Sequence, residues 1–331
     1  MIVLLLINNI NNNIIKYMNK LQLIRNPIVF QGKKYLKKNK NYFEGWYFKN
    51  TSKNNNISFI PGININESEK KAFIQIITKE NSYFINYDIE EFEYSNSPFY
   101  IKIGDNYFSE EKILLDINNS NIRIFGHINY SDYKNIETSF ISPNIMGPFS
   151  YVPFMECNHA IIAMKCRVDG YININEEEIV FENNTGYIEK DWGVSFPKNY
   201  IWCQGNDFEN SNAAFMLSIA SIPLKIFSFK GIISSLIVDN KEYRFATYNN
   251  TKLIRYKIKN NLLDIVLKKG KYYLIIKSHY DDGLKLSAPV KGSMSKDIFE
   301  SITSKITVTL KKNNKVLFSN TSTNCGLEIV Q

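Results

Sequence analysis

The chain lacks the sequence signatures of several large enzyme classes. It contains no G-x-S-x-G nucleophile motif, no phosphate-binding P-loop and no H-E-x-x-H zinc motif, which weakens a hydrolase or nucleotide-dependent function. The four cysteines form no C-x-x-C pair and lie at no metal-ligand spacing from a histidine: Cys157, Cys166, Cys203 and Cys325. We therefore expect no metal site, and reduced thiols in a cytoplasmic protein, with a disulfide between two of them left open.

A basic surface for nucleic acid is also missing. The net charge is +8, but the first 43 residues hold eight basic residues and no acid, so the chain from Glu44 onward is formally neutral. A nucleic-acid-binding protein carries its basic stripe on the folded body. We predict no nucleic-acid partner. We interpret the basic N-terminal segment first as a solvated tail and second as a peripheral contact with an anionic membrane.

Long hydrophobic runs are absent as well. Residues 2–7 are too few to span a bilayer, and no basic stretch precedes them as in a secretory signal. An asparagine-rich stretch follows, for which we find no packing role. We hypothesise that the natural start is Met18 and treat residues 1–20 as an N-terminal extension that is disordered or non-native.

What the sequence does contain favours β-structure. Aromatic residues make up 14% of the chain, and short apolar or alternating runs recur between Asn, Gly, Ser and Asp clusters. Only Ser295–Ser304 carries start signals and a length suited to a helix. We predict an all-β protein with little helix, built from two lipocalin-like antiparallel barrel or sandwich domains at residues 21–180 and 181–331. The irregular, proline-rich segment Ser142–Pro153 precedes the expected domain change near residue 180.

All three tryptophans lie in short motifs that also carry carboxylates or amides. A core does not need a carboxylate beside each indole, because an ionised acid in apolar surroundings is costly unless it is paired. Since side chains alternate along a strand, each motif sorts into two faces. The expected groups are Glu44, Trp46 and Phe48 opposite Tyr47 and Lys49; Tyr187, Glu189 and Asp191 opposite Ile188, Lys190 and Trp192; and Trp202, Gln204 and Asn206 opposite Ile201 and Cys203.

These motifs resemble the tocopherol cyclase family, from about Pro27 to the C-terminus. The matching segments are residues 30–32, 42–49 (YFEGWYFK), 153–159 (PFMECNH), 186–193 (GYIEKDWG) with 195–197, 202–208 (WCQGNDF) and 326–328 (GLE). The resemblance implies two lipocalin-like domains and cyclisation of a prenylated hydroquinone to a chromanol, with no cofactor. The wider group is similar to carotenoid hydratases, which also begin by protonating an isoprenoid alkene.

The implied reaction sets three chemical requirements. Protonating a trisubstituted alkene needs a carboxylic acid that stays protonated near neutral pH, which an apolar cavity favours. Closing the ring needs an acceptor for the phenol proton. The cation needs aromatic faces, each contributing about 2 kcal/mol when desolvated, and it must be shielded from water.

The candidate residues follow from these requirements. Asp191 is the first choice for the acid, with Glu189 beside it, Glu44 as the main rival and His159 as a further catalytic candidate. The substrate-binding candidates are Trp46, Trp192 and Trp202 for lining the path of the cation, Tyr47 and Tyr187 for orienting the phenol, Gln204 for hydrogen bonding it, and Glu156 and Asn206 beside them.

Three functions remain in competition. The first is a cyclase-like enzyme acting on a lipophilic, isoprenoid-type molecule, and the second is a lipocalin-like carrier of such a molecule. Both predict a deep apolar pocket of the kind that β-barrels form at their mouths. The third is an interaction or structural protein with no enclosed cavity, in which Glu189 and Asp191 pair with Lys190 or Lys49, and the tryptophans only fill barrel cores.

Overall fold

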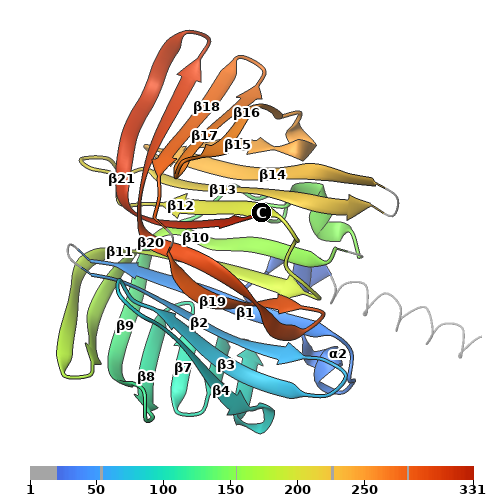
Figure 1. Cartoon of the computed structure of the whole chain (residues 1–331), viewed down its shortest axis with the longest axis vertical. Coiled ribbons are helices and arrows are strands. Elements are labelled where there is room, and N and C mark those ends of the chain that lie inside the picture. Colours follow the sequence, from blue (N-terminus) through green and yellow to red (C-terminus); the bar gives the residue numbers. More distant parts are fainter. Residues whose placement is uncertain (1–20, 53–54, 154, 225–226, 282) are drawn as a thin grey trace, which may run out of the picture.

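The computed structural model describes residues 21–331, apart from 53–54, 154, 225–226 and 282. In these residues the chain is almost entirely β-strand and forms two antiparallel sheets, which confirms the predicted all-β class (Figure 1). The predicted extension over residues 1–20 lies outside the described residues. No helix in the described part is both long and apolar enough to cross a membrane.

The first sheet has eleven strands. They are β1 (Tyr42–Thr51), β2 (Asn56–Ile65), β3 (Lys70–Ile77), β4 (Ser82–Asp88), β5 (Phe92–Asn96), β6 (Phe99–Ile103), β7 (Asn106–Ser109), β8 (Lys112–Asn118), β9 (Arg123–Lys134), β10 (Cys157–Ile174) and β11 (Glu177–Gly193). Short helical elements are α2 (Lys33–Leu36), η1 (Ile89–Glu91), η2 (Gly147–Tyr151) and η3 (Thr247–Asn249).

The second sheet has ten strands. They are β12 (Tyr200–Gly205), β13 (Ala214–Leu224), β14 (Phe227–Val238), β15 (Lys241–Ala246), β16 (Lys252–Lys259), β17 (Leu262–Lys269), β18 (Tyr272–His279), β19 (Leu284–Val290), β20 (Ser293–Lys312) and β21 (Lys315–Val330). The hairpin β19–β20 reaches back over the first sheet, where β20 contacts β2 and β19 contacts β4 (Figure 1).

The order of the first sheet is β4-β3-β2-β1-β11-β10-β9-β8-β7-β6-β5, so that β11 returns to lie beside β1. The sheet curls into a nearly closed barrel, since β4 and β5 at its two edges are joined only by η1. Strand β11 runs continuously through residue 180, where the sequence predicted the domain change. The passage to the second sheet instead lies between Gly193 and Tyr200, because Phe181 and Ile188 of β11 still pack in the first core.

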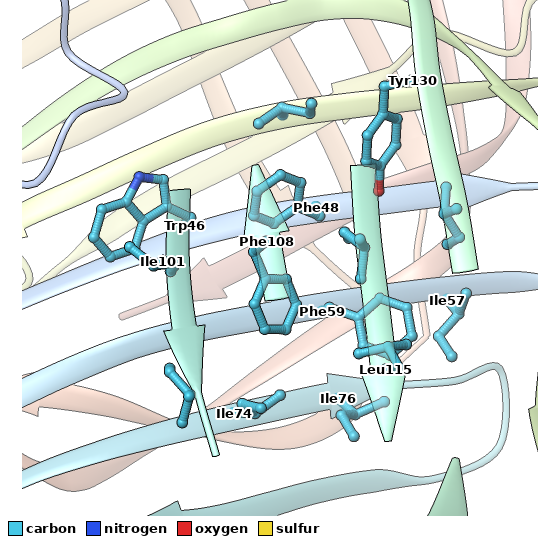
Figure 2. Close-up of a cluster of buried hydrophobic side chains, with 14 of the residues drawn as sticks. Trp46, Phe48, Ile57, Phe59, Ile74, Ile76, Ile101, Phe108, Leu115 and Tyr130 are labelled. Atoms are coloured by element: carbon cyan, nitrogen blue, oxygen red, sulfur yellow. The ribbon is translucent and has the colours of Figure 1, made fainter. Parts of the chain in front are cut away.

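The interior of the barrel formed by the first sheet is filled by apolar side chains from strands on both sides of β1 and β11. Trp46 and Phe48 of β1 pack there with Ile74 of β3, Ile101 of β6 and Phe108 of β7 (Figure 2). The predicted alternation on β1 is confirmed, because Trp46 and Phe48 face this core while Tyr47 packs in a separate cluster between the two sheets. The interior of this barrel is therefore occupied by packed apolar side chains.

The predicted helix at Ser295–Ser304 is wrong. These residues belong to β20, which pairs with β19 on one side and β21 on the other. The capping signals of Ser-Lys-Asp were overridden by tertiary pairing, and the β-branched Ile298 and Ile302 are buried, as suits a strand.

A buried ion pair joins β1 to β11 on the barrel side. The Lys190 ammonium lies 2.5 Å from a carboxylate oxygen of Glu44, and both side chains are fully buried. The same ammonium donates to the carbonyl groups of Pro27 and Val29 and lies over the rings of Trp46 and Trp192. Burial lowers the pKa of Lys190 and Glu44 opposes this effect. The pair therefore fixes the N-terminal segment against the barrel.

We predict that Lys190→Met destabilises the protein by about 3–5 kcal/mol, because it leaves the Glu44 carboxylate buried without a cation. Adding Glu44→Gln should recover part of the loss, since no buried charge then remains. Lys71→Met is the matched control: it breaks the exposed pair with Asp88 and should cost at most about 1 kcal/mol. Denaturant unfolding measures all three variants. Equal midpoints for Lys190→Met and Lys71→Met would contradict the prediction.

Candidate active site

A cavity of about 300 Å³ lies between the two sheets. Its wall is mostly apolar, with Ile60 and Phe73 from the first sheet and Ile232 and Ile298 from the second. The volume is at the lower end of the range for small-molecule sites. The deep apolar pocket expected from the sequence is therefore present, but it is formed between the sheets and not at the mouth of a barrel.

A histidine and two carboxylates meet at this cavity, and all three were predicted as catalytic candidates. His159 Nδ1 lies 2.9 Å from Asp191 Oδ1, and Nε2 lies 3.5 Å from Glu189 Oε2. The residues come together because β10 and β11 pair with His159 opposite Asp191. Glu189 follows on the same face of β11, as the predicted alternation requires, whereas Lys190 points to the barrel side.

Burial and charge set the protonation of this cluster. Burial by itself lowers the pKa of His159, but Asp191 and Glu189 outweigh it and raise the pKa from 6.5 to about 9. Burial raises the pKa of Glu189 to about 7, against the lowering effect of the His159 charge. At neutral pH the imidazole is thus a cation held between two carboxyl groups.

Aromatic side chains surround the cluster. Glu189 Oε2 accepts hydrogen bonds from the Tyr187 hydroxyl at 2.6 Å and from the Trp202 indole at 3.0 Å. The ring of Trp202 packs edge-on against Tyr47, with centroids 5.4 Å apart. Gly326 makes room for the indole, because a Cβ there would lie 2.7 Å from the Trp202 ring. Trp202 and Tyr47 line the cavity, whereas Tyr187, which was predicted to orient the phenol, is fully buried outside the cavity lining and contacts Glu189.

A second pair of carboxyl groups lines the same cavity and was not among the predicted site residues. Glu300 of β20 and Glu328 of β21 are direct partners across the two strands. The Tyr47 hydroxyl donates to Glu300 Oε1 at 2.5 Å, and the Tyr200 hydroxyl donates to Glu328 Oε2 at 2.5 Å. Sequence reasoning missed Glu300 because it lay in the expected helix. Glu328 lay in the matching GLE segment, which was the one available signal.

The structure places several predicted site residues away from the cavity. Glu44, Trp46 and Trp192 lie on the barrel side of β1 and β11, where Glu44 pairs with Lys190 and the two indoles stack around that ammonium. Asn206 is buried and donates to the carbonyl group of Gly186, so it ties β11 to the second sheet. None of these four lines the cavity.

Two further predicted binding residues also lie outside the cavity lining. Gln204 is fully buried, and its amide atoms have no hydrogen-bond partner in the described part of the chain. Glu156 is exposed, and only its carbonyl group takes part in the local structure, where it accepts from Val194 and Ser195. Of the predicted tryptophans, only Trp202 reaches the cavity.

The pairing expected for a purely structural protein is not observed. Within the described residues, Glu189 and Asp191 form ion pairs with His159 and with no lysine or arginine. Lys49 is buried beside Thr51 and donates to the carbonyl group of Asn324, while burial lowers its pKa to about 8. The acids of β11 therefore line the cavity and pair with the histidine of the neighbouring strand β10, and not with a lysine or arginine.

A cation could be considered at the histidine cluster, since donor atoms of His159, Glu189 and Asp191 all lie within 4.8 Å of one another. The imidazole already accounts for this spacing, because each ring nitrogen faces one carboxylate. The four cysteines are free thiols, as predicted. Burial raises the pKa of Cys157, which is the one nearest the cluster.

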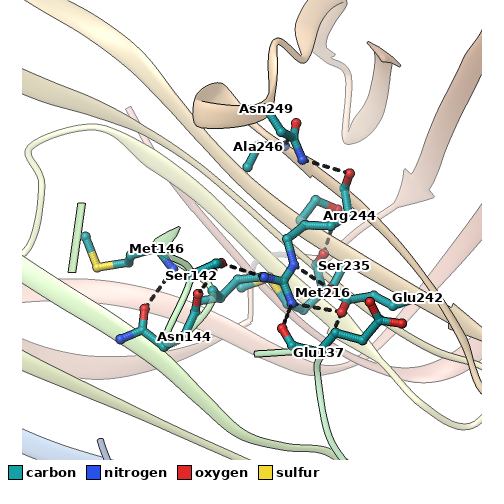
Figure 3. Close-up of polar contacts among 12 residues, drawn as sticks. Glu137, Ser142, Asn144, Met146, Met216, Ser235, Glu242, Arg244, Ala246 and Asn249 are labelled. Atoms are coloured by element: carbon teal, nitrogen blue, oxygen red, sulfur yellow. Dashed lines mark hydrogen bonds and ion pairs between the residues drawn. The ribbon is translucent and has the colours of Figure 1, made fainter. Parts of the chain in front are cut away.

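The segment between β9 and β10 closes one side of the cavity with Met146, Phe149 and Met155. Arg244 of β15 anchors this segment to the second sheet (Figure 3). Its guanidinium donates to the Ser142 hydroxyl at 2.9 Å and to the carbonyl group of Glu137, and it pairs with Glu242 at 2.7 Å. The irregular crossing predicted at Ser142–Pro153 is therefore a fixed wall of the site.

The fold and site together are those of a two-sheet β protein with an acid-lined apolar cavity, and residues 137–330 match the family model described as tocopherol cyclase-like. The chain belongs to this family. A chloroplastic protein of Oryza sativa subsp. japonica, named as a probable tocopherol cyclase, is 29% identical over 109 residues, which cover 32% of this chain and 23% of that protein. The tocopherol cyclase of Zea mays is 34% identical over 74 residues, covering 22% of this chain and 16% of its own length.

Solved structures support the fold at low sequence identity. CghA with Sch210972 superposes with a TM-score of 0.55 at 10% identity, over 88% of each chain. Kievitone hydratase from Nectria haematococca gives a TM-score of 0.50 at 13% identity, over 88% of this chain and 89% of its own. The family and these neighbours include enzymes named as a cyclase and a hydratase, while the curated plant relatives are matched over only a quarter of their length or less.

We predict that the stability of the protein falls as pH rises from 6.5 to 9. The pKa of His159 is raised on folding, so its contribution is complete below pH 6.5 and is lost as pH passes about 9. The shift corresponds to at most about 3 kcal/mol. The free energy of unfolding, measured between pH 6.5 and 9, should decline less steeply with pH in the His159→Gln variant than in the wild type. The exposed His279 gives the control, and His279→Gln should keep the wild-type slope. Parallel profiles for wild type and His159→Gln would show that the cluster does not hold this charge.

Proposed function

We propose that the protein is a tocopherol cyclase-like intramolecular cyclase. It protonates a prenyl double bond of a lipophilic quinol and closes a chromanol ring, as an intramolecular lyase or isomerase without a cofactor. The observation that carries the proposal is the Asp191–His159–Glu189 cluster in the wall of an otherwise apolar cavity, beside Trp202. An apolar chamber with acid groups at one side is what proton-driven ring closure requires.

Asp191 is the proposed proton donor. Its side chain is 21% exposed and lines the cavity, so it can take a proton from solvent and present it to bound substrate. His159 Nδ1 lies 2.9 Å from Asp191 Oδ1, so the imidazolium can pass its proton to Asp191 for transfer to the alkene and regain its charge from solvent afterwards, when it again stabilises the carboxylate. Glu189 holds the other side of the imidazole and so acts as a positioning residue.

The aromatic wall serves the cation that protonation creates. Trp202 is fixed by its hydrogen bond to Glu189 and by the Tyr47 ring, so its position does not depend on the ligand. A desolvated indole contributes about 2 kcal/mol to a nearby cation. The apolar lining keeps water from capturing the cation as a tertiary alcohol.

The expected partner is an isoprenoid-type small molecule with a phenolic head. A protein that takes such molecules from a bilayer can work in the cytoplasm or at the membrane surface, and the basic N-terminal segment offers a peripheral contact. The alternative function is a carrier that binds the same molecule unchanged. The buried charged cluster favours an enzyme over a carrier, because a carrier gains nothing from placing a cation and two carboxyl groups against an apolar ligand.

We predict that Asp191→Asn loses conversion but keeps binding. Purified protein is incubated with a panel of prenylated quinols, and the product is sought as a compound of unchanged mass and altered retention. The variant should be slower by about 100-fold or more, the usual contribution of a general acid. Asp116→Asn, at an exposed position of β8, is the control. Normal turnover in Asp191→Asn would remove Asp191 as the acid, and binding without turnover by the wild type would favour the carrier.

A further inference from the structure

We propose that Glu300 and Glu328 form a second acid–base centre, which accepts the proton released by the attacking hydroxyl group when the ring closes. This inference rests on the proposed function, which puts proton delivery at Asp191. The two carboxyl groups lie on strands β20 and β21, so they belong to the other sheet and face the cavity from a different wall. One wall would therefore give a proton and the other would take one.

The geometry of Glu300 points to a ligand. The residue is 1% exposed, and its Oε1 is held by the Tyr47 hydroxyl, which itself accepts from Ser58. Its Oε2 is buried and has no hydrogen-bond partner among the described residues. Buried polar atoms are rarely left without a partner. Because Glu300 lines the cavity, the hydroxyl group of a bound substrate can supply the missing contact.

The charges of the pair suit a proton acceptor. Burial raises the pKa of Glu300 well above its ordinary value, and the Glu328 charge raises it further. Burial also raises the pKa of Glu328, to about 7. Because the two buried carboxyl groups are partners across β20 and β21, ionising one disfavours ionising the other, and near neutral pH the pair can still take up a proton. A base of raised pKa takes a proton more readily than an ordinary carboxylate.

The proposed step balances in atoms and charge. The alkene takes a proton from Asp191 and forms a C–H bond, leaving a tertiary cation. The hydroxyl oxygen forms the C–O bond, keeps the electrons of its O–H bond and passes its proton to the Glu300–Glu328 pair. The product has the mass of the substrate. After release, the pair loses a proton to solvent and Asp191 gains one. If water were the attacking group, the same pair would remove its proton.

The test is conversion of a prenylated quinol in deuterium oxide. Wild type should give a cyclised product with deuterium at the former alkene carbon. Glu300→Gln/Glu328→Gln should cyclise about 100-fold more slowly or worse. It should still exchange deuterium into the recovered quinol, because Asp191 continues to protonate the alkene and to take the proton back. Asp191→Asn should lose both reactions. Glu93→Gln, at an exposed position of β5, is the control and should match wild type.

The outcomes separate this inference from the function on which it rests. Absence of cyclisation and exchange in wild type would refute the proposed function. If the double variant cyclised the quinol at the wild-type rate, the inference alone would be refuted. Loss of both reactions in a double variant that folds and binds the quinol would refute it as well.

If the double variant does not fold, the Tyr200→Phe variant tests the acceptor role instead. It removes a hydrogen bond that lowers the pKa of Glu328, so the acidic limb of the rate profile should move to higher pH. An unmoved limb would refute the acceptor role.

Discussion

The two-residue alternation of strand β11 is the constraint on which the site depends. Consecutive side chains must leave opposite faces of the sheet, so Lys190 enters the barrel while Glu189 and Asp191 face the second sheet. The two faces then meet opposite needs. The barrel face neutralises Lys190 with Glu44 in complete burial, and the outer face leaves two acids to a histidine at the edge of a cavity. A one-residue slip of β11 against β1 would exchange these environments and bury both acids among apolar rings.

Much of the fold could be predicted from the sequence, since strand content, the faces of β1 and β11 and the resemblance to the family all rest on local patterns. The residues that line the cavity were predicted in part. Asp191, Glu189, His159, Tyr47 and Trp202 reach the cavity as expected, because alternation and motif position locate them. Glu44, Trp46 and Trp192 do not reach the cavity. Alternation along a strand predicts which residues share a face, but it does not predict which face packs into the barrel core and which faces the cavity. The missing fact was the pairing of Glu44 with a lysine 146 positions away. Glu300 was hidden by helix signals that long-range pairing of β20 overrides.

The location of the cavity explains why composition alone does not reveal it. Its lining is assembled from strands of both sheets and from the segment anchored by Arg244, so no single stretch of sequence contains a binding pattern. Each sheet also has a buried apolar cluster of its own, and these two clusters account for most of the buried apolar residues. Stability and ligand binding are thus divided between different parts of the molecule. Substitutions inside the apolar cluster of either sheet act on folding, whereas those in the layer between the sheets act on the site.

The matched family segment, residues 137–330, holds the histidine and the four carboxyl groups of the site: His159, Glu189, Asp191, Glu300 and Glu328. Tyr47, which orients Glu300, lies outside it on β1. The N-terminal strands close the barrel behind these groups and contribute a phenol and apolar walls to the cavity. The carboxyl groups and the apolar surface that shapes the cavity therefore come partly from different stretches of the chain. A substitution at Ile60 or Phe73 would change the shape of the cavity and leave its carboxyl groups in place.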